Sequence, residues 1–557
     1  MMRLTKTLLL SLSIFALICF TPHDTSADKE YKKKCLSVLD SKWSEPRSSE
    51  AKFWVSVCRV TNTNMRNSDA RSELDPKFLK EILTDKRYKA WLPSQGLTVA
   101  GVFFSSTISL NDLVFDLPIK FEDVQFQSNF IVKNSRFLGD FSIEDSHFQE
   151  SFRLDNSELE EQLTIKGSAF IKNKNSNRDP GIDIIHSEIG RSLTIESSRI
   201  QQLNILRSRI GERFSINNNS IFERLRLYYL NLSGDFRFSN SVVDQINFTR
   251  SELGGGIYFD SKKNSTIQQF KVIASKLGES ISLNASGKGV FTFDEFQILE
   301  TDIHRDVNLD KTVFRQKGVK LSDSTIRRTL SFGHDQNSCP TWAPDSTLNL
   351  RLTSTRTLQL PMICNSNPSS VELYGFAFDD LVENAEGTGV SASERPLSWY
   401  LQWLALDASL NPKVYFDWAN FVKEHGNDVT SSGINIAMHE RQRVAYWGQK
   451  HYGQAITAEA SRLIVGYGYQ PTRALIWISV LIGIGAVVLK FTKQGIQNNL
   501  PFGLSYSLDM LLPIVKLRGS HYDIKLHGFA KYYFYAHQLF GYILVGFLLA
   551  GLANVTK

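Results

Sequence analysis

The chain has 557 residues, of which 63 are Lys or Arg and 57 are Asp or Glu, for a formal net charge of +6. This length allows several domains, and a repeat architecture can lengthen a chain without one large globular core. Because the positive excess is mild and no basic run with interleaved aromatic residues stands out, we expect no nucleic-acid partner.

The N-terminus has the three parts of a secretory signal peptide. Arg3 and Lys6 precede an apolar run of 13 residues, 8–20, and a polar stretch then ends at Ala27. We expect cleavage after Ala27, so that residues 1–27 are removed. An uncleaved signal anchor is the alternative, but the run is short for a membrane span. We expect no lipid on Cys19, because the preceding Ile18 is larger than the small residue that lipoprotein signals require.

Four cysteines remain after this cleavage, in two close pairs on either side of the repeats described below. They are Cys35, Cys58, Cys339 and Cys364. In an oxidising compartment this spacing predicts two local disulfides, one within each pair. A zinc site built from all four is the alternative, but neither pair has the two-residue spacing typical of zinc ligands.

Residues 28–99 lack the repeat and are predicted to form an N-terminal helical cap that contains the first disulfide. Within them, DPKFLKEILTDKRYKAWL, residues 75–92, is amphipathic with Pro76 near its start, which predicts one helix. A cap would cover the unpaired strand edges at the end of a repeat stack.

A repeat of 11 residues is clearest over residues 130–170, where four segments align without gaps. One column holds Phe130, Phe141, Phe152 and Leu163, a second Val132, Ile143, Leu154 and Ile165, a third Ser135, Ser146, Ser157 and Ser168, and a fourth Phe137, Phe148, Leu159 and Phe170. The period of two within each segment indicates strands, and short one-sided strands must stack to form a core. The fold class is therefore mainly β, a parallel β-helix of about 22 residues per coil, extending over residues 100–335 in roughly ten coils. The small Ser suits a tight corner where a second Phe would overfill the interior.

A group of acidic residues near the end of the repeats is a candidate catalytic cluster, because parallel β-helices also host polysaccharide-cleaving enzymes. Its members are Asp294, Glu295, Glu300, Asp302, Asp306 and Asp310. Two carboxyl groups about 5 to 9 Å apart can cleave a glycosidic bond. The alternative, which we favour, is that outward positions of a solenoid are simply polar.

Residues 336–392 keep strand-like fragments and the second cysteine pair, and we expect them to close the solenoid. Residues 393–465 change to aromatic helices. One is predicted at NPKVYFDWANFVKEHG, with Asn411 as cap, Pro412 in the first turn and Gly426 as terminator, and another over residues 434–463. This helical hairpin is similar to a single tetratricopeptide-like unit, a type of structure that serves packing or partner binding.

Residues 466–557 are predicted to form a membrane region with two transmembrane helices. The spans are residues 474–489 and 532–555, both without Asp, Glu, Lys or Arg. The loop between them, residues 490–531, carries six Lys or Arg against Asp509 and Asp523. The positive-inside rule places this loop in the cytoplasm and the solenoid on the other side of the membrane. The segment 501–515 between the spans is predicted to lie on the bilayer surface or to dip into it.

Several segments resemble bacterial pentapeptide-repeat-like membrane proteins, some of which are labelled putative membrane-associated oxidoreductases. They are FLKEIL and GLTVAG before the repeats, VELYGFAF and NPKVYFDWANFVKEHG after them, and GYGYQPTRALIW, YSLDMLLPIVKL and HQLFGYILVGFLLAGL in the membrane region. The resemblance covers most of the mature chain and implies a four-sided solenoid. The repeats depart from the pentapeptide pattern in using Ser and Phe and in adding one residue every second unit.

No motif in the sequence indicates a reaction or a cofactor. There is no dinucleotide-binding glycine motif after a strand, and in MHERQR Arg443 stands where a zinc helix requires its second His. We therefore expect a non-enzymatic, membrane-anchored scaffold or binding protein of the bacterial inner membrane. Its solenoid would face the periplasm and bind a protein or glycan of the envelope. The alternatives are an oligomeric channel or membrane effector, for which the chain would form homo-oligomers, and a polysaccharide-processing β-helix enzyme.

Overall fold

The computed structural model describes residues 26–45, 48–58, 71–172, 179–285, 289–383, 391–470, 472–496, 500–512 and 518–555. The chain divides into two compact units. The first comprises Met1–Leu348 and Thr353–Ser369, and the second Asn349–Leu352 and Ser370–Lys557. The predicted signal peptide lies outside the described residues, except for its last two positions.

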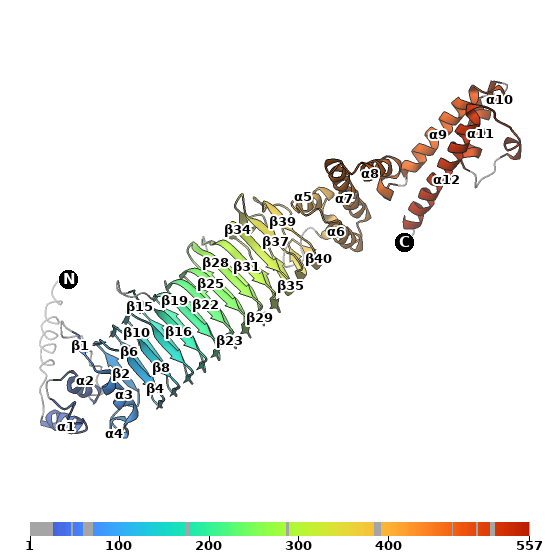
Figure 1. Cartoon of the computed structure of the whole chain (residues 1–557). Coiled ribbons are helices and arrows are strands. Elements are labelled where there is room, and N and C mark those ends of the chain that lie inside the picture. Colours follow the sequence, from blue (N-terminus) through green and yellow to red (C-terminus); the bar gives the residue numbers. More distant parts are fainter. Residues whose placement is uncertain are drawn as a thin grey trace, which may run out of the picture. The chain divides into compact units, whose positions relative to one another are not determined.

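The first unit is a parallel β-solenoid of about 12 coils with about 22 residues per coil, and Figure 1 shows its successive coils side by side. One coil comprises β10 (Phe141–Glu144), β11 (His147–Phe148), β12 (Phe152–Asp155) and β13 (Glu158–Leu159). Strands β10 and β13 belong to one sheet, and β11 and β12 belong to the other. Phe141 pairs with Ile119 in the preceding coil and Leu163 in the following one, so the register is 22 residues. The predicted β-helix and its coil length are confirmed.

The longer strands continue this stack in both sheets. The sheet that contains β12 also has β4 (Ile108–Asn111), β8 (Phe130–Lys133), β16 (Gly181–Ile185), β19 (Arg199–Leu206), β22 (Ile221–Tyr228), β25 (Val242–Thr249), β28 (Ser265–Ile273), β31 (Phe291–Leu299) and β34 (Thr312–Ser322). The sheet that contains β10 also has β2 (Leu97–Ala100), β6 (Ile119–Glu122), β14 (Leu163–Lys166), β18 (Leu193–Glu196), β21 (Phe214–Asn217), β24 (Phe236–Ser239), β27 (Ile257–Ser261), β30 (Ile281–Ala285) and β33 (Val307–Asn308).

All four columns predicted to point inward between residues 130 and 170 are buried. The Phe rings also stack from coil to coil, since the ring of Phe148 lies with its centroid 4.2 Å from that of Phe126 and 4.3 Å from that of Phe170. The core of the solenoid is therefore a set of ladders of like side chains, as the 11-residue period predicts.

The predicted number of coils was too low, because the repeat is harder to see outside its clearest stretch. In the first coils the Ser column is filled by Val102, Leu113 and Val124, all of them buried. Parallel pairing also continues beyond residue 335. Strand β35 (Thr325–Ser331) pairs with β38 (Ser354–Gln359), and β34 pairs with β36 (Thr341–Trp342).

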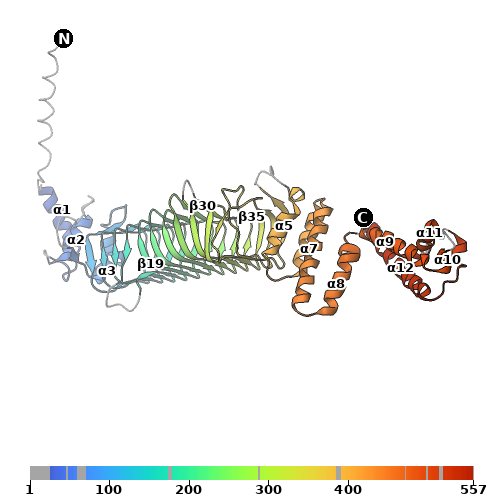
Figure 2. The ribbon, with the colours of Figure 1, turned by 90° about the horizontal axis from the view of Figure 1, so that it is seen from above.

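Four helices precede the repeats at the β2 end of the solenoid, and three of them are labelled in Figure 2. They are α1 (Ser26–Leu36), α2 (Ser49–Cys58), α3 (Pro76–Thr84) and α4 (Lys86–Lys89). The single helix predicted over residues 75–92 is wrong, because Asp85 has an extended backbone and its side chain accepts a hydrogen bond from the Arg87 backbone N–H, which starts a new helix. Pro76 does begin α3, as predicted.

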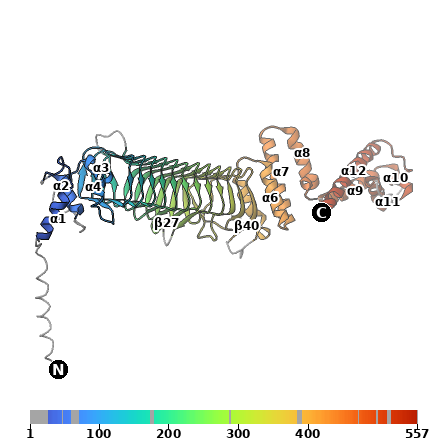
Figure 3. The same cartoon turned by 90° about the horizontal axis from the view of Figure 1, so that it is seen from below.

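The second unit contains strands β39 (Ser370–Glu372) and β40 (Ala377–Val382) and a series of helices, seen from below in Figure 3. Helices α5 (Leu397–Ala405) and α6 (Pro412–Glu424) precede α7 (Asp428–Gly448) and α8 (Tyr452–Val465). Asn411 caps α6 as predicted. The one helix predicted over residues 434–463 is wrong, because Lys450 has a left-handed backbone, with φ of 61°, and separates α7 from α8.

Three helices of the second unit pack against one another, namely α9 (Thr472–Lys490), α11 (Leu500–Leu511) and α12 (Phe529–Val555). The short α10 (Lys493–Ile496) follows α9. Within the described residues, α9 alone is long and apolar enough to cross a membrane by the combined test of length and composition. Helix α12 has 27 residues, but its first half includes the polar residues His537 and Gln538.

Candidate functional site

A continuous corner of the solenoid is formed where each residue of the Ser column follows a left-handed residue. Asn134 and Asn156 have φ of 51° and 47°, and each precedes a buried Ser. The backbone N–H of Ser135 donates to Ser157 Oγ at 3.1 Å, and the backbone N–H of Ser157 donates to Ser187 Oγ at the same distance. Each hydroxyl thus satisfies a buried corner N–H in the neighbouring coil, which explains the Ser column better than its small size alone.

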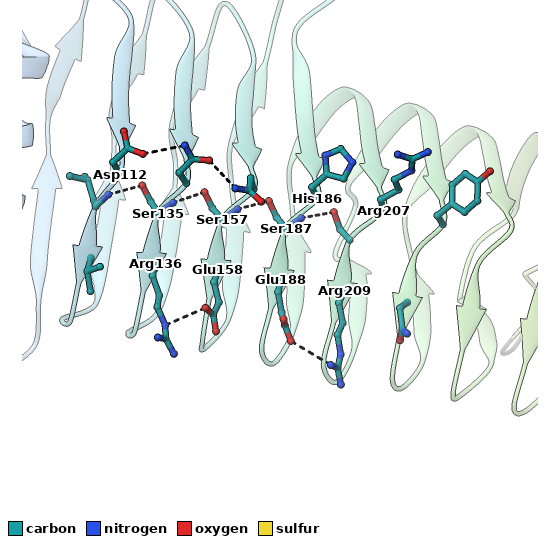
Figure 4. Close-up of a pocket in the computed structure, with 17 residues that line it drawn as sticks. Asp112, Ser135, Arg136, Ser157, Glu158, His186, Ser187, Glu188, Arg207 and Arg209 are labelled. Carbon is teal, nitrogen blue, oxygen red and sulfur yellow. Dashed lines mark hydrogen bonds and ion pairs between the residues drawn. The ribbon is translucent and has the colours of Figure 1, made fainter.

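The residues on either side of this Ser ladder line an open groove that runs across six coils. Its volume is about 930 Å³. Figure 4 shows Asp112, His186 and Arg207 along one edge and Arg136, Glu158, Glu188 and Arg209 along the other. Because neighbouring coils are ~4.8 Å apart, equivalent side chains repeat at that spacing along the groove.

The first edge of the groove changes in character along its length. Asn134 Nδ2 donates to Asp112 Oδ1 at 3.1 Å, and Asn156 Nδ2 donates to Asn134 Oδ1 at 2.9 Å. Further along, the guanidinium carbons of Arg207 and Arg250 lie 5.6 Å and 5.8 Å from the ring centroid of Tyr229. This edge therefore offers amides at one end and an aromatic ring with two cations at the other.

Charges of both signs alternate along the second edge. Arg136 Nε lies 3.2 Å from Glu158 Oε2, and Arg209 Nη1 lies 3.7 Å from Glu188 Oε1. At the aromatic end of the first edge, Arg250 Nη1 donates to the Tyr229 hydroxyl at 2.7 Å, and this bond raises the pKa of Arg250. The groove is thus rich in hydrogen-bonding groups and open to solvent, which suits an extended polar ligand.

Among the predicted carboxylates, Glu295 is the one that is buried, with 7% of its surface exposed. It lies on β31 and accepts hydrogen bonds from Gln269 Nε2 at 2.5 Å and Gln297 Nε2 at 2.6 Å. Burial acts to raise the pKa of Glu295, but the Gln269 hydrogen bond and the charges of Lys271 and Lys317 outweigh it, so that the pKa lies below its usual value. Glu295 is therefore held as a paired carboxylate and not as a proton donor.

The structure does not bring the six acidic residues together as one cluster. Asp302 lies on β32 (Asp302–Ile303), in the sheet opposite to that of Glu295. Arg327 binds it through two nitrogens, at 3.0 Å and 2.6 Å, and this hydrogen bonding lowers the pKa of Asp302. Asp306 lies 3.4 Å from Arg328 Nε, and Asp310 accepts from Ser331 Oγ at 2.6 Å. These acids form separate polar contacts.

The cysteines form the two predicted disulfides, Cys35–Cys58 and Cys339–Cys364, so the zinc alternative is wrong. In the part of the chain that the structure describes, no group of three or more His, Cys, Asp or Glu residues is placed to hold a metal ion. In the MHERQR segment, the ring of His439 stacks on Tyr467, with centroids 5.0 Å apart, and Glu440 pairs with Arg443 at 2.9 Å.

The groove was not predicted from the sequence, although a signal for it was present. The positions directly before and after each Ser of every second repeat form its edges, and they carry Asn, His, Arg, Glu and Tyr. No family model matches the chain, and neither the curated proteins nor the solved structures contain a match.

Proposed function

We propose that the chain is a membrane-anchored envelope protein whose solenoid acts as a binding scaffold for an extended glycan or protein segment. The groove along the Ser ladder is the observation that carries this proposal. It combines amides, paired charges of both signs and the Tyr229 ring in one open channel of about 930 Å³. Aromatic rings stack on sugars or side chains, while repeated polar groups fix a polymer along its length.

Membrane anchoring by α9 and α12 is part of the proposal. It is supported by the apolar character of α9 and by the close packing of the three helices at small residues. A Cβ at Gly541 of α12 would collide with the carbonyl oxygen of Leu511, and a Cβ at Gly485 of α9 would collide with Ser507 Oγ. The signal peptide and the basic loop 490–531 support a periplasmic solenoid in the inner membrane of a bacterium. The resemblance to pentapeptide-repeat-like membrane proteins agrees with this arrangement.

The experiment compares two arginines that occupy equivalent places on different corners of the solenoid. Arg209 follows the ladder residue Ser208 and lines the groove, whereas Arg199 follows Ser198 on the other corner. Both side chains are exposed. The purified protein is used as bait against solubilised envelope glycans and proteins. Arg209→Glu should remove ligands that Arg199→Glu and the wild type retain. Equal capture by both variants would place binding outside the groove.

A channel or membrane effector is a second candidate, because α11 carries buried polar residues between α9 and α12. Ser507 and Asp509 are both fully buried. Such residues within a membrane helix bundle are costly and commonly serve transport. Two spans could enclose a pore only as an oligomer, so the test is single-channel recording in liposomes together with the subunit number in detergent. Conductance that is lost in Asp509→Asn would favour this candidate over the scaffold.

A further inference from the structure

A second, smaller cavity lies in the membrane-proximal part of the chain, between α11, the segment 518–528 and the start of α12. Its volume is about 380 Å³, and the residues that line it include Tyr506, His521, Lys525, His527, Lys531 and Phe534. Four of these six carry a basic group, and none of the residues described as lining the cavity has a carboxyl group. The electrostatics of the cavity therefore favour an anion.

The position of His521 within this cavity is fixed from behind. Its Nδ1 lies 2.7 Å from Asp509 Oδ2, and both residues are buried. The same carboxylate oxygen accepts from the Arg518 backbone N–H at 3.0 Å, while the rings of Phe502 and Tyr506 pack against the imidazole with centroids 5.6 Å away. Because Nδ1 is occupied, a ligand in the cavity would meet the Nε2 side of a ring that is already oriented.

The surroundings of the cavity favour a lipid as the source of that anion. Phe529, Tyr532 and Tyr535, at the start of α12, expose 77%, 72% and 60% of their surface. Aromatic side chains beside basic ones are typical of the level of the lipid headgroups. Lys531 Nζ lies 5.9 Å from the Tyr535 ring centroid, which places the ammonium over the edge of this aromatic zone.

An adjoining cavity of about 440 Å³ shares His527 with the first. It is lined by Lys493 together with Val488, Phe491 and Phe529. A basic group next to apolar walls can accommodate the region where a headgroup meets its acyl chains.

From this arrangement we propose that the cavity binds the phosphate of an anionic phospholipid, in contact with His521, Lys525 and Lys531. The proposal rests on the membrane anchoring proposed above, because α9 and α12 must lie in a bilayer for a lipid to reach the site. The bound lipid would hold α11 and α12 together at the basic side of the membrane.

The test uses the full-length protein in nanodiscs and measures lipid binding by native mass spectrometry and by thermal shift. Phosphatidylglycerol is the probe, with phosphatidylcholine as the zwitterionic control and glycerol 1-phosphate as the soluble headgroup. We expect phosphatidylglycerol to bind in preference to both. The double variant Lys525→Gln/Lys531→Gln should weaken that binding by at least about tenfold.

The matched control is Lys490→Gln, which removes the same charge at the end of α9 and outside both cavities. It should leave phosphatidylglycerol binding within about twofold of wild type, since a general charge effect alone is modest. Equal losses in the double variant and this control would overturn the site, and equally strong binding of glycerol 1-phosphate would overturn the lipid assignment. Failure of the wild type to enter nanodiscs would instead overturn the anchoring, and the lipid site with it.

Discussion

Phe148 and Phe170 stand 22 residues apart in the chain, and their rings stack with centroids 4.3 Å apart and an angle of 4° between their planes. One complete coil of the solenoid separates the two. This contact therefore reports directly on the register of the repeat, and the first prediction depends on it.

Phe148→Asp should reduce the free energy of unfolding by about 3–5 kcal/mol, because it removes a stacked ring and buries a charge without a partner. His147→Asp is the matched control, since His147 precedes Phe148 on β11 and is exposed. It should cost less than about 1 kcal/mol. Chemical denaturation of the purified protein measures both. Similar losses in the two variants would show that the inward column is assigned wrongly.

Ser157→Ala should cost about 1–3 kcal/mol, because it leaves the buried Ser135 N–H without the acceptor 3.1 Å away. Ser142→Ala, on the outward side of β10, tests the same chemical change where the side chain is partly exposed, and it should be nearly neutral. Thermal unfolding would distinguish them. A neutral Ser157→Ala would mean that water or backbone movement replaces the hydroxyl.

Removing the second disulfide with Cys339→Ala/Cys364→Ala should destabilise the protein by about 2–4 kcal/mol in denaturant titrations. Peptide mapping without reductant should recover Cys35 linked to Cys58 and Cys339 linked to Cys364. Four free thiols in protein isolated from the native host would contradict the oxidising compartment on which the proposed location depends.

Glu295→Gln should destabilise the protein by about 1–2 kcal/mol at pH 7, because the carboxylate loses its charge-assisted bonds to Gln269 and the nearby lysines. The lowered pKa of Glu295 determines how this loss depends on pH. The unfolded chain binds the proton more tightly, so the stabilisation is fully present above the ordinary value of 4.5 and is lost as the pH falls through the lower folded pKa.

The difference in stability between wild type and Glu295→Gln should therefore shrink as the pH falls from about 5 to about 3. Glu223→Gln replaces an exposed carboxylate on β22 and should stay within about 0.5 kcal/mol of wild type. Denaturant titration across this pH range provides the measurement. A constant difference for Glu295→Gln would show that its charge contributes nothing.

Topology can be tested with Arg199→Cys on the solenoid and Lys493→Cys in the loop between the proposed spans. A membrane-impermeant maleimide added to spheroplasts should label position 199 and leave position 493 unlabelled until the membrane is disrupted, as the positive-inside rule predicts. Equal labelling of intact spheroplasts at both positions would contradict the proposed orientation.

The sequence was sufficient to predict features that repeat or that depend on neighbouring residues. The ladders around Phe148 follow from the 11-residue period, and Asn411 and Pro412 mark the start of α6. The breaks at Asp85 and Lys450 were missed, because a local side-chain cap and a left-handed residue interrupt otherwise helical patterns. The partners of Glu295 and the edges of the groove lie about one coil apart in the chain, so they become neighbours only once the coils have stacked.

The sequence repeats every 11 residues, but one coil requires 22, and this difference limits how the solenoid can change in length. Deleting two repeats would shorten the rod while leaving each remaining corner above its own kind. Deleting a single repeat would turn everything downstream within the solenoid by half a revolution. Arg209 would then stand over the corner that Arg199 now occupies, and the groove would be cut in two although every core position stayed filled. Length variants of this protein that keep an unbroken groove should therefore differ by even numbers of repeats.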